Sequence, residues 1–224
     1  MNVVFDQVYY INMKKDVERN ENMKKLCKRL GFNATRIEGV EVDYRDYDKS
    51  TYRNFLDKSE KYLNGQLGCR EAHLNAVKDA KTNNHNRVLI FEDDVWCDER
   101  LNFETYLKLN YYAIEIGDIN FLGGLVEPGY RNQIVCAHAY TLNKNTYDDI
   151  INMGVASGME IDNFYAKIIQ HMSVNKYGGK YIVNKIYPFN TFKQNRLFKS
   201  NIRDEEVIDP NFTVLPDEKQ KELS

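Results

Sequence analysis

Three consecutive carboxylates, Glu92-Asp93-Asp94, follow directly after the apolar run Val88–Phe91. Such a run predicts a buried strand, and open α/β sheets bind ligands just beyond the carboxyl ends of their strands. Successive side chains of a strand point to opposite sides, so Glu92 and Asp94 are expected on one side and Asp93 on the other. Two carboxylates on one side are hard oxygen ligands that suit Mg²⁺ or Mn²⁺, and such an ion recruits a diphosphate. The alternative interpretation is a solvated strand end followed by a turn, where Asp is common.

The segment from Gly65 to Leu74 precedes the acidic strand by one predicted helix. Gly65 and Gly68 would let the backbone approach a ligand closely at a helix start. His73 lies on the same predicted helix, where a histidine is more often a packed or surface residue than a catalytic one.

The sequence lacks the motifs of several other enzyme classes. The sequence contains no Gly-x-x-x-x-Gly-Lys-Ser/Thr, no Gly-x-Gly-x-x-Gly and no His-Glu-x-x-His, which counts against a P-loop enzyme, a standard Rossmann dehydrogenase and a zincin. Its four cysteines form no Cys-x-x-Cys pair and have no histidine at zinc-site spacing. We therefore expect free, buried thiols in a reducing compartment.

The charge balance excludes two further classes of partner. Lys and Arg total 31 against 33 Asp and Glu, a net charge of −2 over 224 residues. Proteins that bind nucleic acid or an anionic membrane surface usually carry a basic excess, so neither is expected as a partner. No apolar run approaches the length of a membrane span, and the first residues do not resemble a secretion signal. A cytoplasmic location is the resulting expectation, whereas the oligomeric state is left open.

Hydrophobic periodicity predicts strands that alternate with helices through most of the chain. The predicted strands are 7–12, 34–38, 88–92, 119–122, 134–142 and 181–186. The predicted helices are 16–30, 66–82, 102–116, 144–153 and 161–171. Gly31 suits the end of the first helix, Gly123-Gly124 the end of a strand, and Gly154 a helix stop. This alternation predicts an α/β class with a mostly parallel central sheet flanked by helices. Residues 203–224 are charged and contain two prolines, which predicts a tail.

Eight segments, taken in order, resemble those of one known family. They are Ile11-Asn12 with Arg19; Leu30-Gly31-Phe32; Arg36 to Val40; Gly65 to Leu74; Leu89 to Val95; Cys136 to Tyr140; Ile161-Asp162; and Pro188, Gln194, Ser200 and Ile202. Their ordered combination resembles glycosyltransferase family 25, which includes bacterial lipooligosaccharide β-galactosyltransferases and collagen-hydroxylysine galactosyltransferases. Ala72 stands where the family usually has Ser, and Cys136-Ala137 replaces Gly-Thr, which leaves the donor and acceptor preference open.

The resemblance implies a single GT-A-like, Rossmann-type nucleotide-binding domain over residues 1–202, with 203–224 as the tail. It implies an inverting transfer of galactose or glucose from a UDP-sugar donor to a hydroxyl of a glycan or protein acceptor, with Mn²⁺ or Mg²⁺ as the cofactor. Inversion requires one displacement, so one base must deprotonate the acceptor hydroxyl while UDP leaves. The transition state should carry oxocarbenium character, as in glycoside hydrolysis.

The expected site residues follow from these needs. Glu92 and Asp94 are assigned to the metal, and Asp162 to the general base, with Glu160 as its substitute. A helix N-cap is an equally good interpretation of Asp162. The expected donor-binding residues are Asn12, Arg19, Asp93, His138 and Gln194.

Two other functions fit the same acidic cluster. A metal-dependent nucleotidyltransferase would turn over a nucleoside triphosphate instead of a UDP-sugar. A catalytically inactive nucleotide-sugar-binding or assembly module would bind the donor without turnover.

Overall fold

The fold is an α/β arrangement, seen in a computed structural model that describes residues 5–54, 56–127, 133–170 and 179–194. The first half contains, in order, β1 (Gln7–Asn12), α1 (Val17–Arg29), β2 (Ala34–Glu38), the 3-10 turns η1 (Tyr44–Asp46) and η2 (Lys49–Tyr52), α2 (Glu60–Thr82), β3 (Arg87–Glu92) and β4 (Val95–Trp96). The second half contains α3 (Phe103–Leu109), α4 (Tyr111–Ile116), β5 (Ile119–Glu127), β6 (Gln133–Asn143), η4 (Lys144–Thr146), α5 (Tyr147–Ala156), α6 (Ile161–Phe164), its π-helical continuation η5 (Tyr165–Ile169), β7 (Val183–Lys185) and β8 (Lys193–Gln194).

Six strands form the central sheet in the order β2-β1-β3-β6-β5-β7. The pairs β1–β2, β1–β3 and β5–β7 are parallel, whereas β6 runs antiparallel to both of its neighbours. The expected fold class, a mostly parallel sheet flanked by helices, is therefore confirmed, with one antiparallel strand inside it. A separate short ribbon pairs β4 with β8 and brings Val95 opposite Gln194.

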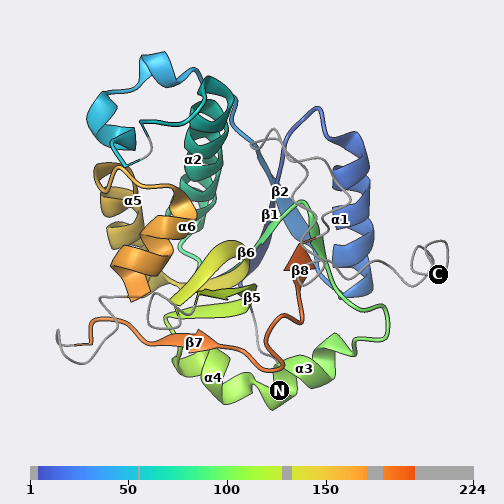
Figure 1. The fold of residues 1–224 in the computed structure, drawn as a ribbon. Coiled ribbons are helices and arrows are strands. Elements are labelled where there is room, and N and C mark those ends of the chain that lie inside the picture. Colours follow the sequence, from blue (N-terminus) through green and yellow to red (C-terminus); the bar gives the residue numbers. More distant parts are fainter. Residues whose placement is uncertain (1–4, 55, 128–132, 171–178, 195–224) are drawn as a thin grey trace.

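Both faces of the sheet are covered by helices, as Figure 1 shows, with α2, α5 and α6 on one face and α1 on the other. Alternate residues of β3 supply the two cores: Val88 and Ile90 pack in one, with residues of α2, α5 and α6, and Leu89 and Phe91 in the other, with residues of α1 and α3. All four side chains are fully buried, as expected for a strand in the middle of a two-sided sheet.

Helix α1 ends where the sequence predicts. Gly31 has φ of +80°, and the Phe32 N–H donates to the Cys27 carbonyl across the turn. A glycine adopts this left-handed conformation without steric penalty, so it terminates the helix and turns the chain toward β2.

Helix α2 begins six residues earlier than expected. The Ser59 hydroxyl accepts a hydrogen bond from the Tyr62 N–H and caps the helix at that point. Gly65 and Gly68 therefore lie inside the helix, and the expected glycine-rich helix start is wrong. Gly68 serves packing instead, because a Cβ there would lie 2.1 Å from the Val40 carbonyl oxygen.

Two other glycine predictions fail for the same physical reason. Strand β5 continues through Gly123 with register shifts instead of ending there, and the Phe192 carbonyl and the His138 ring occupy the space of a missing Cβ. Helix α5 continues past Gly154, where a Cβ would lie 2.9 Å from Leu74 Cδ2 of α2. These glycines allow close approach between elements.

Helix 102–116 is instead two helices, which meet at Asn110. The Asn110 side chain donates to the Tyr106 and Tyr187 carbonyls and accepts from the Tyr187 N–H, so it connects the break to the segment after β7. The four cysteines are free, as expected.

No helix among the described residues is both long and apolar enough to cross a membrane. The predicted tail, the domain boundary at 202, Ser200 and Ile202 lie outside the described residues, as does the end of helix 161–171.

Replacing Gly68 with Ala is expected to destabilise the protein by about 3 kcal/mol, because the added methyl meets the Val40 carbonyl and one of the two backbones must move. Thermal unfolding should show a fall in Tm of about 6–12 °C. Asn75→Ala, at an exposed position of the same helix, is the matched control and should change stability by less than about 0.5 kcal/mol. A Gly68→Ala variant as stable as this control would contradict the packing role.

Candidate functional site

The acidic cluster lies where β3 ends and the chain turns into β4, and the two core faces separate its side chains. Glu92 continues the row of Val88 and Ile90 and faces α2. Asp93 continues the row of Leu89 and Phe91 and faces α1. The predicted separation of Glu92 from Asp93 is therefore confirmed.

Asp93 is held by two residues of the β1–α1 region. Its carboxylate accepts from Asn12 Nδ2 at 2.8 Å and from Arg19 Nη1 at 2.7 Å. The Arg19 side chain is only 11% exposed and is therefore largely shielded from solvent. Burial opposes its charge, but Asp93 and then Asp94 outweigh that effect and raise the pKa of Arg19. Three of the predicted donor-binding residues thus form one buried, charge-balanced group.

Glu92 contacts residues from two other elements. Its Oε1 lies 3.4 Å from His73 Nε2 of α2, and its Oε2 accepts from Gln194 Nε2 of β8 at 3.1 Å. The β4–β8 ribbon explains the second contact, because it pairs Gln194 with Val95, three residues beyond Glu92. The structure therefore brings the predicted donor-binding Gln194 to a predicted metal ligand.

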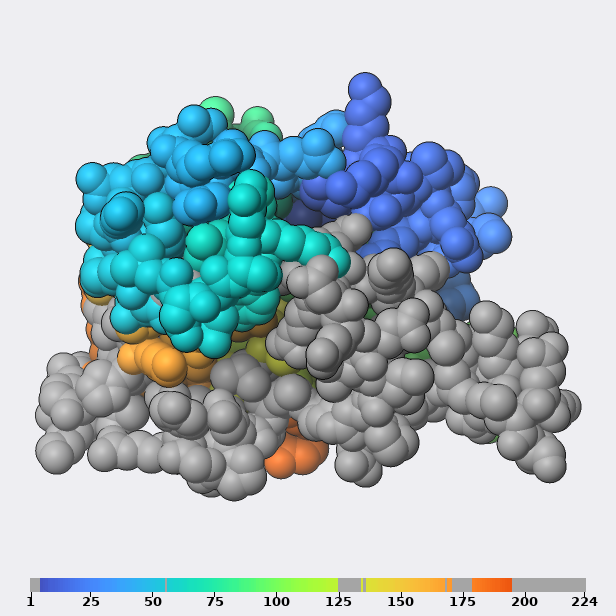
Figure 2. All heavy atoms as spheres, turned by 45° about the horizontal axis from the view of Figure 1, so that its top comes forward, coloured from blue at the N-terminus to red at the C-terminus, as the bar shows by residue number. Residues whose placement is uncertain are grey.

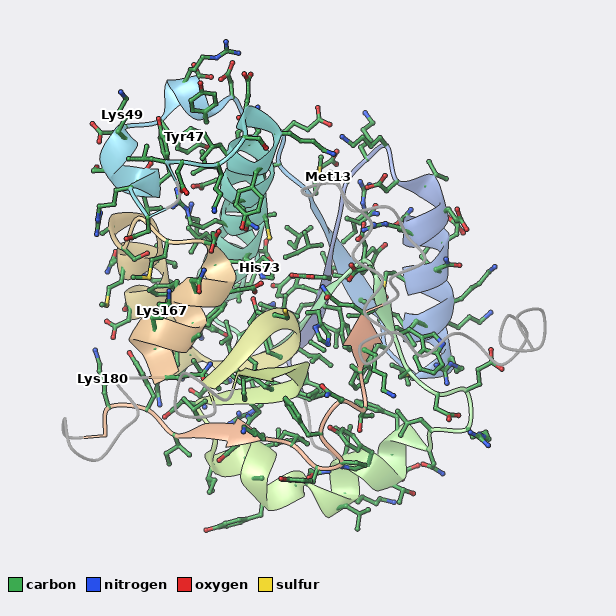
Figure 3. All side chains as sticks on the ribbon, in the orientation of Figure 1. Met13, Tyr47, Lys49, His73, Lys167 and Lys180 are labelled. Carbon is green, nitrogen blue, oxygen red and sulfur yellow. The ribbon has the colours of Figure 1, made fainter. Side chains whose placement is uncertain are left out.

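His73 is fully buried and faces the sheet from α2, between α6 and β6 (Figure 3). Its Nδ1 lies 2.7 Å from the Tyr140 hydroxyl of β6, which in turn lies 3.4 Å from the Tyr165 hydroxyl. Burial lowers the pKa of His73 to about 4, against a smaller opposite effect of Asp162. The imidazole is therefore neutral at pH 7 and can accept at one ring nitrogen.

Asp162 lies in the first turn of α6, next to β6. Its Oδ1 accepts from the Ala137 N–H at 2.8 Å. Burial and the charge of Glu92 raise its pKa to about 6, although the hydrogen bond from Ala137 and the proximity of His73 favour the ionised form. A carboxylate with such a pKa can accept a proton near neutral pH.

Glu160, not Asp162, occupies the N-cap position of α6, so the capping interpretation of Asp162 is wrong. Glu160 Oε1 accepts from the Tyr62 hydroxyl at 2.6 Å, and its other oxygen accepts from the Asn163 side chain.

Asp94 lies in the turn after β3. Its charge acts both on the group of Asn12, Arg19 and Asp93 and on a thiol of α2. Its charge raises the pKa of both Arg19 on one side and Cys69 on the other. Burial is the largest influence on Cys69, followed by the charges of Glu92, Asp162, Asp94 and Asp93. All four carboxylates therefore act electrostatically on the same thiol.

His138 differs from the other predicted residues. It is buried on the opposite face of β6 from Tyr140, and its Nε2–H donates to the Phe192 carbonyl at 3.0 Å. The contact ties β6 to the segment before β8, and Gly123 makes room for it.

Cys69 is the site residue that the sequence reasoning missed. Its Sγ, a ring nitrogen of His73 and a Glu92 carboxylate oxygen lie within 4.8 Å of one another. Cys69 and His73 are four residues apart, a spacing that puts both on one face of a helix. The expectation that no cysteine has a histidine at zinc-site spacing is therefore wrong for this pair.

The described residues on this side of the molecule belong to two regions. Figure 2 shows the segment around residues 40–60 with the start of α2 on one side and the region of α1 on the other. Asn12, Arg19 and Asp93 belong to the α1 side, whereas Cys69, His73, Glu92 and Asp162 belong to the α2 side.

Comparison with known proteins gives two findings. The profile of glycosyltransferase family 25, described as LPS biosynthesis protein, matches residues 5–123, more than half of the chain. A crystal structure described as a glycosyltransferase involved in the glycosylation of the major capsid of PBCV-1 matches with a TM-score of 0.50 and 11% sequence identity, over 87% of this chain and 95% of that one. At this identity the structural likeness concerns the fold. No curated protein matches.

The matched residues include Asn12, Arg19, Cys69, His73 and the three carboxylates at the end of β3, Glu92-Asp93-Asp94. The chain belongs to glycosyltransferase family 25.

Proposed function

We propose that this glycosyltransferase is inverting and metal-dependent, and that it transfers galactose or glucose from a UDP-sugar to a hydroxyl of a glycan or protein. The observation that carries the proposal is the position of Asp162. The fold brings this partly buried carboxylate, with its raised pKa, into electrostatic range of Glu92 at the strand end. A single displacement requires a base for the acceptor hydroxyl, and Asp162 can supply it beside the residues that would hold the cation.

The carboxylates of the proposed metal site fit a hard divalent cation such as Mn²⁺ or Mg²⁺. Glu92 and Asp94 offer carboxylate oxygens, the preferred ligands of such ions. The charge of Asp93 is already compensated by Arg19, whereas on the α2 side burial and then repulsion from Glu92 raise the pKa of Asp162. A cation held by Glu92 and Asp94 would relieve that repulsion. When bound, it would supply Lewis-acid stabilisation of the leaving diphosphate.

Asp162 would take the proton of the acceptor hydroxyl. The Ala137 N–H fixes Oδ1 at 2.8 Å, so we assign the proton to the other oxygen, Oδ2. The hydrogen bond holds the carboxylate in one orientation, which a proton transfer over hydrogen-bond distance requires.

Donor binding would use the α1 side. Asn12 and Arg19 hold Asp93 in place, and this group lies next to the Asp94 turn, so we assign the three to the nucleoside or the sugar. Gln194 is assigned to the diphosphate or the sugar because it already touches Glu92. His138, whose Nε2 is used by the Phe192 carbonyl, would act by supporting the β6–β8 contact.

The primary test is UDP release from a panel of UDP-sugars, with a hydroxyl acceptor panel, in the presence and absence of Mn²⁺. We expect Mn²⁺-dependent release from UDP-galactose or UDP-glucose. UDP binding by calorimetry without turnover would favour an inactive binding module, and turnover of a nucleoside triphosphate would favour a nucleotidyltransferase. The absence of both release and UDP binding would refute the proposal.

Replacing Asp94 with Ala should lower Mn²⁺-dependent turnover by at least about 100-fold, because a lost metal ligand removes several kcal/mol of charge stabilisation in the transition state. Asp98→Ala is the matched control: Asp98 is a nearby surface aspartate paired with Arg100, and its loss should leave turnover within about twofold. Unchanged activity in Asp94→Ala would remove Asp94 from the metal site.

Replacing Asp162 with Asn should lower kcat by about 10²–10⁴-fold, the range for loss of a general base, and leave UDP affinity unchanged. The amide oxygen can still accept from Ala137, so the local fold is preserved. Steady-state kinetics and calorimetry separate the two quantities. Loss of both would mean that Asp162 does not act as the base.

The same variant should be more stable than the wild type near pH 7.5. The pKa of Asp162 rises from 3.8 to about 6 on folding, so the folded state loses stability as pH increases through that window. Above pH 6 the raised pKa lowers the free energy of unfolding of the wild type by about 2 kcal/mol, a figure that allows for solvent at the partly exposed edge of the carboxyl. Denaturant unfolding in EDTA should show the advantage of Asp162→Asn at pH 7.5 and its disappearance by pH 4. A difference independent of pH would contradict this.

A further inference from the structure

The group of Cys69, His73 and Glu92 has the composition of a site for a softer metal than the one the transfer reaction needs. The Cys69 sulfur, a ring nitrogen of His73 and a Glu92 carboxylate oxygen lie within 4.8 Å of one another, and His73 Nε2 is 3.4 Å from Glu92 Oε1. Ligand atoms around a tetrahedral Zn²⁺ lie about 3.3–3.8 Å apart, given metal–ligand distances of about 2.0–2.3 Å. Side-chain movements of about 1 Å would close the remaining gap.

His73 points independently to a ligand at this place. The side chain is fully buried, and its Nε2 has no hydrogen-bond partner in the described structure, although it is aimed at Glu92. Leaving a buried ring nitrogen unsatisfied is unfavourable, so such an atom usually has a partner. A metal ion would supply one.

The opposite ring nitrogen is arranged as in metal-binding histidines. His73 Nδ1 lies 2.7 Å from the Tyr140 hydroxyl, whose oxygen can accept an N–H from the ring. Histidines that bind a metal usually donate their second N–H to such a partner, which fixes the tautomer and the ring orientation. This arrangement leaves the lone pair on Nε2, the ring nitrogen that lies 3.4 Å from Glu92 Oε1.

The surroundings are anionic. The charges of Asp162, Asp94 and Asp93 act on Cys69 in addition to that of Glu92. Arg19 is paired with Asp93, 2.7 Å away, on the other face. A divalent cation at the trio would therefore lie in a favourable field.

We infer that Cys69, His73 and Glu92 form a binding site for Zn²⁺ or a similar thiolate-seeking divalent ion. The thiol transfers its proton to solvent as the sulfur–metal bond forms, the neutral imidazole binds through Nε2, and Glu92 binds through a carboxylate oxygen. Three protein ligands leave a fourth position open. Because the site takes Glu92, Zn²⁺ would inhibit the Mn²⁺-dependent transfer; this last consequence rests on the proposed function.

Cobalt provides a direct test that does not depend on activity. Titration of the full-length, metal-free protein with Co²⁺ should produce a sulfur-to-cobalt charge-transfer band that saturates at one equivalent. Cys69→Ser should abolish the band, whereas Cys136→Ser, at the other partly buried cysteine, should retain it. A wild type without the band, or a Cys69→Ser variant that keeps it, would overturn the inference.

Protection from alkylation tests the site in the wild-type protein, without any substitution. One equivalent of Zn²⁺ should slow the alkylation of Cys69 at least tenfold, as followed by mass spectrometry, and leave that of Cys136 unchanged. Equal rates with and without Zn²⁺ would contradict the site even if a variant failed to fold.

The inhibitory consequence has its own readout. Micromolar Zn²⁺ should suppress Mn²⁺-dependent UDP release in the wild type and do so at least tenfold less effectively in Cys69→Ser. If neither protein releases UDP, the proposed function fails while the cobalt result still decides the metal site. If Zn²⁺ inhibits both proteins equally, the coupling through Glu92 is wrong.

Discussion

Strand β3 is buried on both faces, and this constraint determines how the charges of the site are arranged. Its alternate side chains enter two separate cores, so the carboxylates that continue the strand must point to opposite faces as well. Glu92 therefore meets α2, and Asp93 meets α1. Without that separation, adjacent carboxylates would repel one another on the same side of the sheet.

The carboxylates on the two faces of the sheet differ in how far their charge is neutralised. On the α1 side, Arg19 and Asn12 satisfy Asp93, and the result is a neutral, buried group. On the α2 side, Glu92, Asp162 and the Asp94 turn share one region, and burial together with repulsion raises the pKa of Asp162. That second group is unfavourable for the folded chain by itself. Such unrelieved charge is typical of a functional site, because a ligand rather than the protein completes it.

Close packing holds α2 and the segment that contains Gln194 against the end of strand β3. Gly68 lets α2 lie against the backbone at Val40, and Gly154 lets α5 lie against α2. Gly123 admits the His138 ring and the Phe192 carbonyl, and the segment after Phe192 supplies Gln194. In each case a side chain would occupy space that a neighbouring element now fills, so the positions of His73 and Gln194 depend on residues that have no chemistry of their own.

Local sequence patterns by themselves determined the class of fold, the buried strand before Glu92, the opposite directions of Glu92 and Asp93, and the end of α1 at Gly31. These features depend on periodicity and on backbone conformation, which neighbouring residues control. The same patterns misplaced the start of α2 and gave Gly123 and Gly154 the wrong role, because a glycine that ends an element and one that admits another look alike in sequence.

Only the tertiary structure decided which distant residues meet. It brought His73 and Cys69 of α2, Gln194 of β8 and Asp162 of α6 to the end of β3, and it directed His138 to the opposite face. Contacts between residues 19 to more than 100 positions apart depend on how helices and sheet pack. The pKa of a buried carboxyl likewise depends on neighbours that no local pattern specifies.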